Sequence, residues 1–579
     1  MTQMRASTGG PTSSSPVDRD STGTRRAVPS QSDVVFLGAL VVINALTYLG
    51  SLGFYSDDWA YLGSLHSFGD YSNAGRSSVE AYDFSRHVWA RPTQAAYQWV
   101  LFRFFGTEPI GYHVVNALVI AAMVVILYLL LREFGASRIA SVSASVVLGT
   151  MPNFATDRFW FAAFGYGLTT GACLLAVYAS LRALRNPQSI SAIWKTTAVA
   201  SLIVCGMGYE VALPVAVFGL SLVWWRARSW FADRAMPRAG LRGATLLLPE
   251  FLVIVASVVY KVMTAVQTEI PGSYFSYLLR IAAGAVTTNL VAWGTDLPRA
   301  TWWALGVSGM RGLLVGAVVA LAAFVYLRRL ALLESPERGT WLPFVGTGAA
   351  VFVLGYVIFA TNARILFTAT GIGNRVAIAA STGIAVAGVG VIGLLSSRGR
   401  GPFRATVFSL VVALWVGAGT CAVLALAQQW AGAWAREQNV LEDLQQDLPT
   451  LPANSTVILT GVCPYEGSAT VFESNWDLAG ALEILYNDPT VKADVAGEGL
   501  RIRANAVESV LYGTHKARYP YGSALLIYDH GSREISRAVD AGAARDALGE
   551  VLACPGRPGQ GETILPADDL QRRIESWLQ

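Results

Sequence analysis

Two adjacent carboxylates, Asp57 and Asp58, follow directly after a long apolar run, in the stretch FYSDDWAYL. Three aromatic residues, Tyr55, Trp59 and Tyr61, flank the pair. A positioned carboxylate can take a proton from a hydroxyl group, so this stretch suits general base catalysis. Successive residues of a helix diverge by about 100°. The two carboxylates therefore cannot aim at one atom, and we expect them to have different roles.

Further ionisable side chains stand beside or within apolar runs. They are Arg91, His113, Asp157, Glu210, Lys261, Arg364 and Arg375. Ionisable groups at membrane depth are costly and are candidates for functional sites. Each one also has a simpler interpretation, because acids at helix ends can lie in water and long basic side chains can anchor at the membrane interface. The functional hypothesis rests on the set, since acids and arginines from several loops could enclose one cavity.

The elements that must position these groups are membrane-spanning helices. The chain has 579 residues, of which 53% are hydrophobic and only 14% charged, whereas a soluble protein carries about a quarter charged residues. Apolar runs recur between about residues 34 and 428. We predict eleven spans, at 34–54, 109–131, 138–152, 161–181, 194–209, 211–225, 243–265, 312–327, 342–361, 376–395 and 405–428.

Lys and Arg are concentrated in alternate loops, which favours a cytoplasmic location for those loops. Residues 1–33 contain four arginines and are rich in Ser, Thr, Gly and Pro. We expect this segment to be disordered and cytoplasmic. An odd number of spans then places the chain after residue 428, and all the candidate residues above, on the outer side of a plasma membrane.

Within the long outer loop 55–108, the stretch VEAYDFSRHVWARPTQAAYQWVLFRFFG at 79–106 has apolar and aromatic residues at helical spacing, interrupted at Pro92. This pattern predicts one or two amphipathic helices at the interface, which could roof a cavity.

Residues 429–579 predict a separate extracytoplasmic domain after the transmembrane domain 34–428. A helix is expected over 429–448, followed by a small α/β domain with strands in STVILTG and SALLIYD. Asp529-His530-Gly531-Ser532 is interpreted as a hairpin turn. Cys463 and Cys554 could form a disulfide in an extracytoplasmic domain, or remain two free buried thiols. The domain contains no catalytic motif; it could bind a glycan or serve as support.

In chain order, Asp57-Asp58, Arg91-Pro92, His113, Asn116, Asp157 and Glu210 resemble the pattern of GT-C glycosyltransferases, in particular their protein O-mannosyltransferase-like branch. The resemblance covers roughly residues 34–215. It implies a bacterial membrane enzyme that transfers a sugar from a polyprenyl-phosphate donor to a hydroxyl of a cell-wall or surface glycan, a lipid or a protein. Two positions depart from the pattern: Asp157 stands where Glu is commoner, and Tyr209 where Lys or His is expected.

The resemblance also implies roles. Asp57 would be the base of an inverting transfer, and Asp58 would orient the acceptor or bind a divalent cation, Mg²⁺ or Mn²⁺. Asp157 would help to hold the acceptor or that cation. The acceptor cavity would include Glu210, Arg91 and His113. Because a guanidinium binds phosphate oxygens in a bidentate manner, Arg364 and Arg375, with Lys261 behind them, are candidates for holding the donor phosphate.

Other function classes remain open. A transporter or a flippase for lipid-linked glycans often shows inverted repeats, and we find none here. A polysaccharide polymerase or ligase of related architecture would depend more on the outer-loop arginines than on the Asp pair. The sequence lacks a P-loop or Rossmann fingerprint, so we expect neither a nucleotide-sugar donor nor a nucleic-acid partner.

Overall fold

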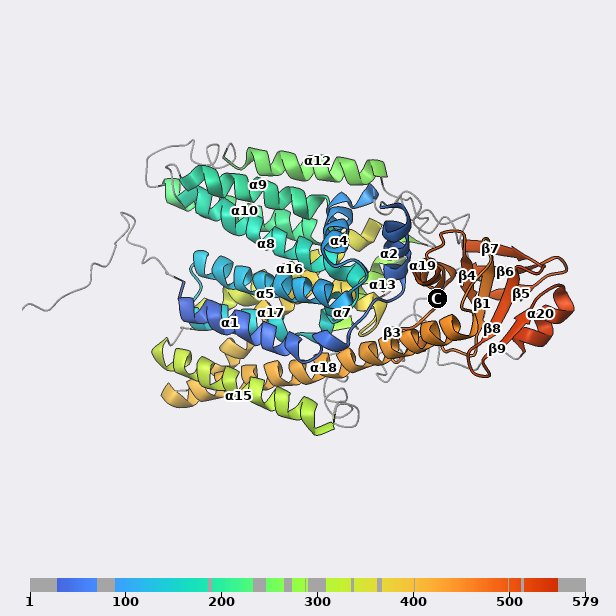
Figure 1. Ribbon diagram of the computed structural model, residues 1–579. Helices are drawn as coiled ribbons and strands as arrows, with labels where there is room; N and C mark the ends of the chain where they lie inside the picture. The colour runs from blue at the N-terminus through green and yellow to red at the C-terminus, as the bar shows by residue number, and fades with distance from the viewer. Residues whose placement is uncertain are drawn as a thin grey trace, which may run out of the picture.

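The computed structural model consists of a bundle of long helices with a smaller sheet-containing domain at one end of it (Figure 1). It describes residues 29–69, 89–185, 190–232, 246–264, 273–286, 288–289, 309–334, 338–361, 367–399, 401–497, 499–511 and 515–549. The predicted fold class, a helical polytopic membrane protein with a C-terminal α/β domain, is confirmed.

Each of the eleven predicted spans overlaps one helix of the bundle. These helices are α1 (Gln31–Leu46), α5 (Pro109–Glu133), α6 (Arg138–Thr150), α8 (Phe164–Arg185), α9 (Ile190–Gly206), α10 (Leu213–Ala232), α12 (Leu248–Thr264), α15 (Gly309–Leu333), α16 (Arg338–Val357), α17 (Ile378–Ser396) and α18 (Gly401–Asp447). Among the described residues, eight helices are long and apolar enough to cross a membrane. The remaining three, α6, α9 and α12, are shorter.

The outside of the bundle is apolar. Leu252, Val255 and Val259 on α12 and Leu314 and Val318 on α15 are each more than half exposed. Such side chains are unfavourable in water over so large a surface, but they are the expected surface toward lipid tails. The bundle therefore has the surface of a membrane-embedded protein.

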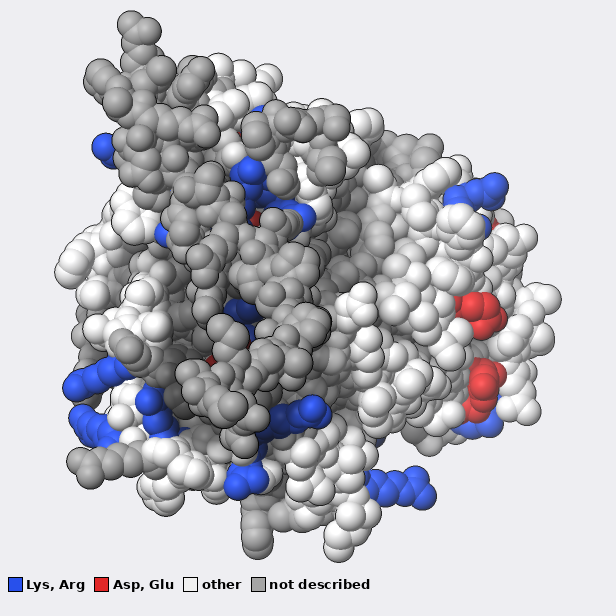
Figure 2. All heavy atoms as spheres, turned by 90° about the vertical axis from the view of Figure 1, so that its left-hand side faces the viewer, with Lys and Arg blue, Asp and Glu red and all other residues white. Residues whose placement is uncertain are grey.

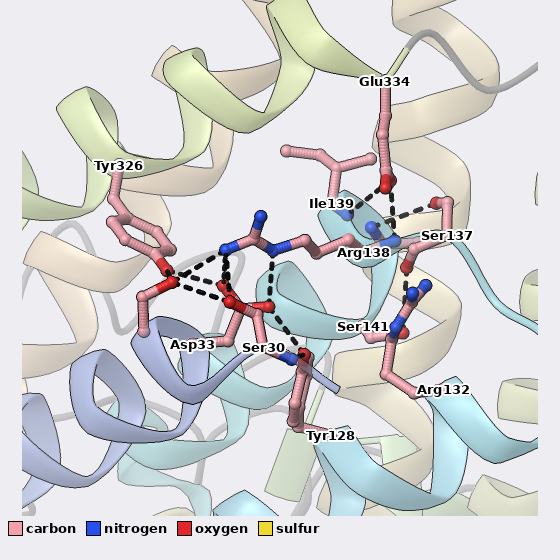
Figure 3. Close-up of polar contacts among 12 residues, drawn as sticks. Ser30, Asp33, Tyr128, Arg132, Ser137, Arg138, Ile139, Ser141, Tyr326 and Glu334 are labelled. Atoms are coloured by element: carbon pink, nitrogen blue, oxygen red, sulfur yellow. Dashed lines mark hydrogen bonds and ion pairs between the residues drawn. The ribbon is translucent and has the colours of Figure 1, made fainter. Parts of the chain in front are cut away.

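Charged side chains gather at both ends of the bundle. Figure 2 shows the end away from the sheet domain, where Lys and Arg are spread over the face and Asp and Glu reach it mainly at one edge. Beneath this face Asp33 on α1 is fully buried and accepts two hydrogen bonds from Arg138 on α6, at 2.6 and 2.8 Å. The hydroxyls of Tyr128 and Tyr326 donate to it at 2.6 and 2.5 Å (Figure 3). Asp33 thus joins α1, α5, α6 and α15.

In the described part of the chain, the helices between the spans include α2 (Asp57–Phe68), α4 (Pro92–Phe105) and α13 (Tyr274–Val286). Helix α4 lies in the stretch 79–106, where amphipathic helices were expected, and residues 70–88 are not described. Helix α4 begins at Pro92, where the pattern is interrupted, because the first turn of a helix needs no donor at that position. Phe104 is 79% exposed, as expected for a helix at an interface.

The C-terminal domain contains a four-stranded sheet in the order β4-β1-β8-β9. Strand β1 (Thr456–Thr460) is parallel to β4 (Lys492–Val495) and β8 (Leu525–Asp529), and β9 (Glu534–Arg537) pairs antiparallel with β8. The interpretation of residues 529–532 as part of a hairpin turn is therefore confirmed. A second, antiparallel sheet comprises β5 (Leu500–Ile502), β6 (Ala506–Leu511) and β7 (His515–Pro520), and a short pair comprises β2 (Tyr465–Glu466) and β3 (Ala469–Thr470).

This domain meets the bundle along helix α18 and against helix α2. Helix α18 runs for 47 residues from the bundle into the domain (Figure 1), and Arg533 in the β8–β9 turn bonds Asp447 at its end, at 2.8 Å. Helix α19 (Asn475–Tyr486) lies against α2; a side chain at Gly480 would overlap the carbonyl oxygen of Trp59, 2.2 Å from the added carbon. The remaining helix, α20 (Ala541–Leu548), follows β9.

Candidate active site

The candidate residues meet around one short segment between the spans. It contains η2 (Pro152–Phe154), α7 (Thr156–Phe159) and η3 (Phe161–Ala163). The Ala162 N–H donates to Asp58 Oδ1 at 2.7 Å, and the Ala162 carbonyl accepts hydrogen bonds from Gln94 at 2.9 Å and Tyr209 at 3.1 Å. One backbone unit therefore connects α2, α4 and the loop before α10.

Asp58 is fully buried and both of its oxygens are engaged by backbone N–H groups. Besides the bond from Ala162, Oδ2 accepts from the Tyr55 N–H at 3.0 Å. Burial raises the pKa of Asp58 well above its usual range; the backbone hydrogen bonds oppose this, and the neighbouring charge of Asp57 adds to it. Asp58 thus holds the start of α2 against η3.

Asp57 is only partly buried. Its Oδ1 accepts a hydrogen bond of 2.9 Å from the indole N–H of Trp476, at the start of α19. It also interacts electrostatically with Arg375 and with Asp58. The two carboxylates therefore point to different surroundings, as the helical geometry of adjacent residues requires.

Asp157 is fully buried on α7. Neither carboxylate oxygen has a hydrogen-bond partner among the described residues, while its backbone carbonyl accepts from Asn116 at 2.8 Å. Burial raises the pKa of Asp157 well above its usual range, and the positive charges of Arg375 and Arg158 oppose that shift. A buried carboxylate without hydrogen bonds is costly, which makes it a candidate for contact with a ligand.

Arg375 and Arg91 lie on the two sides of a stacked tyrosine pair. Tyr166 on α8 and Tyr209 stack at 3.6 Å between ring centroids. The Arg91 guanidinium lies 4.5 Å from the centre of the Tyr209 ring, and Arg375, on η7 (Ile372–Ala377), interacts with Tyr166. The Arg375 guanidinium also lies 5.1 Å from the ring centre of Trp160, a cation–π contact.

Glu210, at the start of η4 (Glu210–Ala212), lies between two cations. Its carboxylate is 3.2 Å from Lys261 Nζ and 3.7 Å from Arg91 Nε. Lys261 Nζ also donates to the backbone carbonyls of Ala90, at 2.8 Å, and Gly208. In this arrangement the ammonium of Lys261 neutralises Glu210 and ties α12 to two loops.

The other predicted residues lie outside this group or outside the described chain. His113 on α5 is buried and forms a 2.9 Å hydrogen bond with the Gly53 carbonyl, beneath the start of α2. Arg364 and Cys554 are not among the described residues. Cys463 is disulfide-bonded, and its pairing with Cys554 stays a prediction.

The residues around Asp58 and Asp157 do not fit a divalent cation well. Both Asp58 oxygens already accept backbone hydrogen bonds. Within the described part of the chain, no group of three or more His, Cys, Asp or Glu side chains could hold a metal ion. Hard cations require several oxygen ligands, and the side chains of Asp58 and Asp157 do not provide enough of them.

Inside the bundle, an apolar cavity of about 410 Å³ lies between α5, α8, α10, α16 and α17. Its walls include Leu127, Val177, Leu222, Phe344 and Val386. The lining residues on α17, Thr382 and Val386, follow Arg375 by 7 and 11 residues in sequence. At 1.5 Å per helical residue, the cavity begins roughly 10–15 Å along the helix from that arginine.

Comparison with known proteins finds similarity to solved structures only at low sequence identity. No protein-family model matches the chain, and no curated protein sequence matches it. The crystal structure of ArnT from Cupriavidus metallidurans bound to undecaprenyl phosphate is similar to it with a TM-score of 0.36 and 16% sequence identity, over 81% of this chain and 87% of that one. The apo state of ArnT gives a TM-score of 0.34 and 14% identity, over 79% and 89% of the two chains.

Proposed function

We propose that this protein is a membrane glycosyltransferase of the GT-C type, which transfers a sugar from a polyprenyl-phosphate donor to an acceptor hydroxyl with inversion at the anomeric carbon. The observation that carries the proposal is the location of Asp57 and Arg375 at one site: Arg375 lies over the ring of Trp160, and the indole N–H of Trp160 donates to the Tyr55 carbonyl, two residues before Asp57. An incompletely buried carboxylate interacts with an arginine held over an aromatic ring. A transfer from a phosphate leaving group needs both a base and a cation in one place.

In the proposed reaction the acceptor hydroxyl attacks the anomeric carbon as the bond from that carbon to the phosphate oxygen breaks. Asp57 takes the hydroxyl proton, and the polyprenyl phosphate leaves with the bonding electron pair. Asp58 serves as a positioning residue, because its two backbone hydrogen bonds fix the first turn of α2. Asp157, which has no hydrogen-bond partner among the described residues, is the proposed contact for an acceptor hydroxyl.

Arg375 is the proposed ligand of the leaving phosphate, since a guanidinium can bind two phosphate oxygens at once. Arg364 remains a second candidate for this role. Lys261 is a weaker one than the sequence suggests, because its ammonium already contacts Glu210 and the Ala90 carbonyl. Arg91 and Glu210 would shape the acceptor side of the cavity.

The apolar cavity between α5, α8, α10, α16 and α17 is proposed to hold part of the polyprenyl chain. Its lining is mostly apolar, with Arg226 as the one charged residue among those that line it, and it lies along α17 from Arg375. A donor bound by its phosphate near Arg375 could therefore place its tail in the cavity.

The experiment begins with mass spectrometry of lipids that copurify with the protein, which identifies the donor. The protein is then reconstituted with that lipid, and the release of free polyprenyl phosphate is measured with water as the acceptor of the sugar. Release by the wild type and its loss in Arg375→Ala would support the proposal. Movement of the lipid across the bilayer with no cleavage would contradict it and favour a flippase.

A further inference from the structure

The C-terminal domain reaches the proposed base directly. Trp476 lies in its helix α19 and donates its indole N–H to Asp57 Oδ1 at 2.9 Å. Trp476 is only 4% exposed, so water does not compete freely for this hydrogen bond. The two residues are 419 positions apart in the chain.

A second contact from the same segment fixes the residue before Asp57. Ser56 has φ 48° and ψ −122°, a left-handed conformation that non-glycine residues rarely adopt. Its hydroxyl donates to Glu473 Oε1 at 3.0 Å. A strained backbone persists only where its surroundings hold it, and here the C-terminal domain supplies part of that support.

The segment that makes these contacts is itself rigid. Ser474 and Asp477 form a reciprocal capping box at the start of α19, and the Asp477 carboxylate also accepts from the Glu473 N–H at 2.8 Å. Gly480 lets α19 approach α2 closely. A rigid donor on a tightly packed helix can orient a side chain more accurately than a loop can.

We infer that Trp476 is a positioning residue for Asp57, so that the C-terminal domain completes the active site of the transmembrane domain. The hydrogen bond to Oδ1 would fix the orientation of the Asp57 carboxylate toward the acceptor hydroxyl. It would also stabilise the carboxylate form of Asp57, the form able to accept a proton. This inference rests on the proposed role of Asp57 as the base.

Other charged groups also act on Asp57. They include Asp58 on the same helix and Arg375 on η7, and Glu473 bonds the adjacent Ser56. Trp476→Phe leaves these groups in place but removes the indole N–H together with part of the buried ring, so the shift of the pH profile, and not the loss of kcat alone, tests the hydrogen bond.

The first test compares Trp476→Phe with Tyr486→Phe in the full-length protein, using the copurified polyprenyl-phosphate sugar as donor. Tyr486, at the other end of α19, donates to the Leu448 carbonyl at 2.7 Å, so its variant controls for a lost hydrogen bond on the same helix. We expect Trp476→Phe to lower kcat roughly tenfold with KM unchanged. We also expect it to move the acidic limb of the pH profile up by about one unit. A wild-type kcat and pH profile in Trp476→Phe would overturn the inference.

A second test needs no substrate and so separates this inference from the proposed function. Asp57→Cys places a thiol at the same site, and its alkylation by N-ethylmaleimide is followed against pH. The described native thiols, Cys173, Cys205 and Cys421, are buried. Adding Trp476→Phe should raise the apparent pKa of the new thiol, whereas adding Tyr486→Phe should not. Identical curves in the two backgrounds would contradict the inference even if sugar transfer is confirmed.

Discussion

Replacing Asp58 by Asn should destabilise the protein strongly, whereas the same change at Asp57 should not. Asp58 is fully buried, with Oδ1 2.7 Å from the Ala162 nitrogen and Oδ2 3.0 Å from the Tyr55 nitrogen. An asparagine amide has one oxygen and one NH₂ group, so one of the two backbone donors would face another donor. Losing a hydrogen bond to a charged group costs about 1.5–3 kcal/mol, and a buried N–H left unsatisfied costs about 1–3 kcal/mol.

We therefore expect Asp58→Asn to lower the free energy of unfolding by about 2–5 kcal/mol. The value should lie toward the lower end of this range, because the variant no longer buries a charge. Asp57→Asn keeps an acceptor for Trp476 and lies at a partly exposed position, so its loss should stay below about 1 kcal/mol. Urea unfolding in mixed micelles, followed by tryptophan fluorescence, measures both variants. A stability of Asp58→Asn equal to that of Asp57→Asn would refute the positioning role of Asp58.

Three further predictions follow from other parts of the molecule. Asp33→Asn should reduce stability by about 3–5 kcal/mol because it breaks a buried charged pair. Turnover per folded molecule should stay unchanged. A loss of turnover without a loss of stability would contradict this structural role of Asp33. Burial raises the pKa of Asp494 to about 6, so the unfolded state loses this proton first as the pH rises. The C-terminal domain should therefore become less stable by roughly 2 kcal/mol between pH 4 and pH 6. Hydrogen exchange in strands β1, β4 and β8 should show that loss in the wild type and not in Asp494→Asn. Leu222→Trp, which fills the apolar cavity, should raise KM for a long-chain donor but not for a two-isoprene donor. The control is Val353→Trp on the outer surface, where the native side chain is 58% exposed; it should leave KM for both donors unchanged.

The helices of the bundle could be predicted from the sequence because each span repeats one simple signal, a long apolar run. The different surroundings of Asp57 and Asp58 could also be predicted from local geometry, since adjacent residues on a helix diverge. Helix α13 was missed because it has only 13 residues and includes Arg280 within its apolar face.

The contacts that complete the site could not be predicted, because they join residues far apart in the chain. The hydrogen bond from Trp476 to Asp57 leaves no local pattern; the only nearby signal is the capping box of Ser474 and Asp477. Lys261 illustrates the same limit. Its position in an apolar run indicated a functional cation, but only the structure shows that its ammonium already contacts Glu210 and two backbone carbonyls.

The most direct test of the central claim is a single-turnover assay of sugar transfer by Asp57→Asn, with the reconstituted protein in excess over a labelled polyprenyl-phosphate sugar. Asn is nearly isosteric and keeps the acceptor for Trp476, so folding and donor binding should be retained. We predict that the rate of transfer falls by at least 10²–10⁴-fold, the usual contribution of general base catalysis, while the donor Kd stays within about twofold of the wild type. Transfer by Asp57→Asn at the wild-type rate would contradict the assignment of Asp57 as the base.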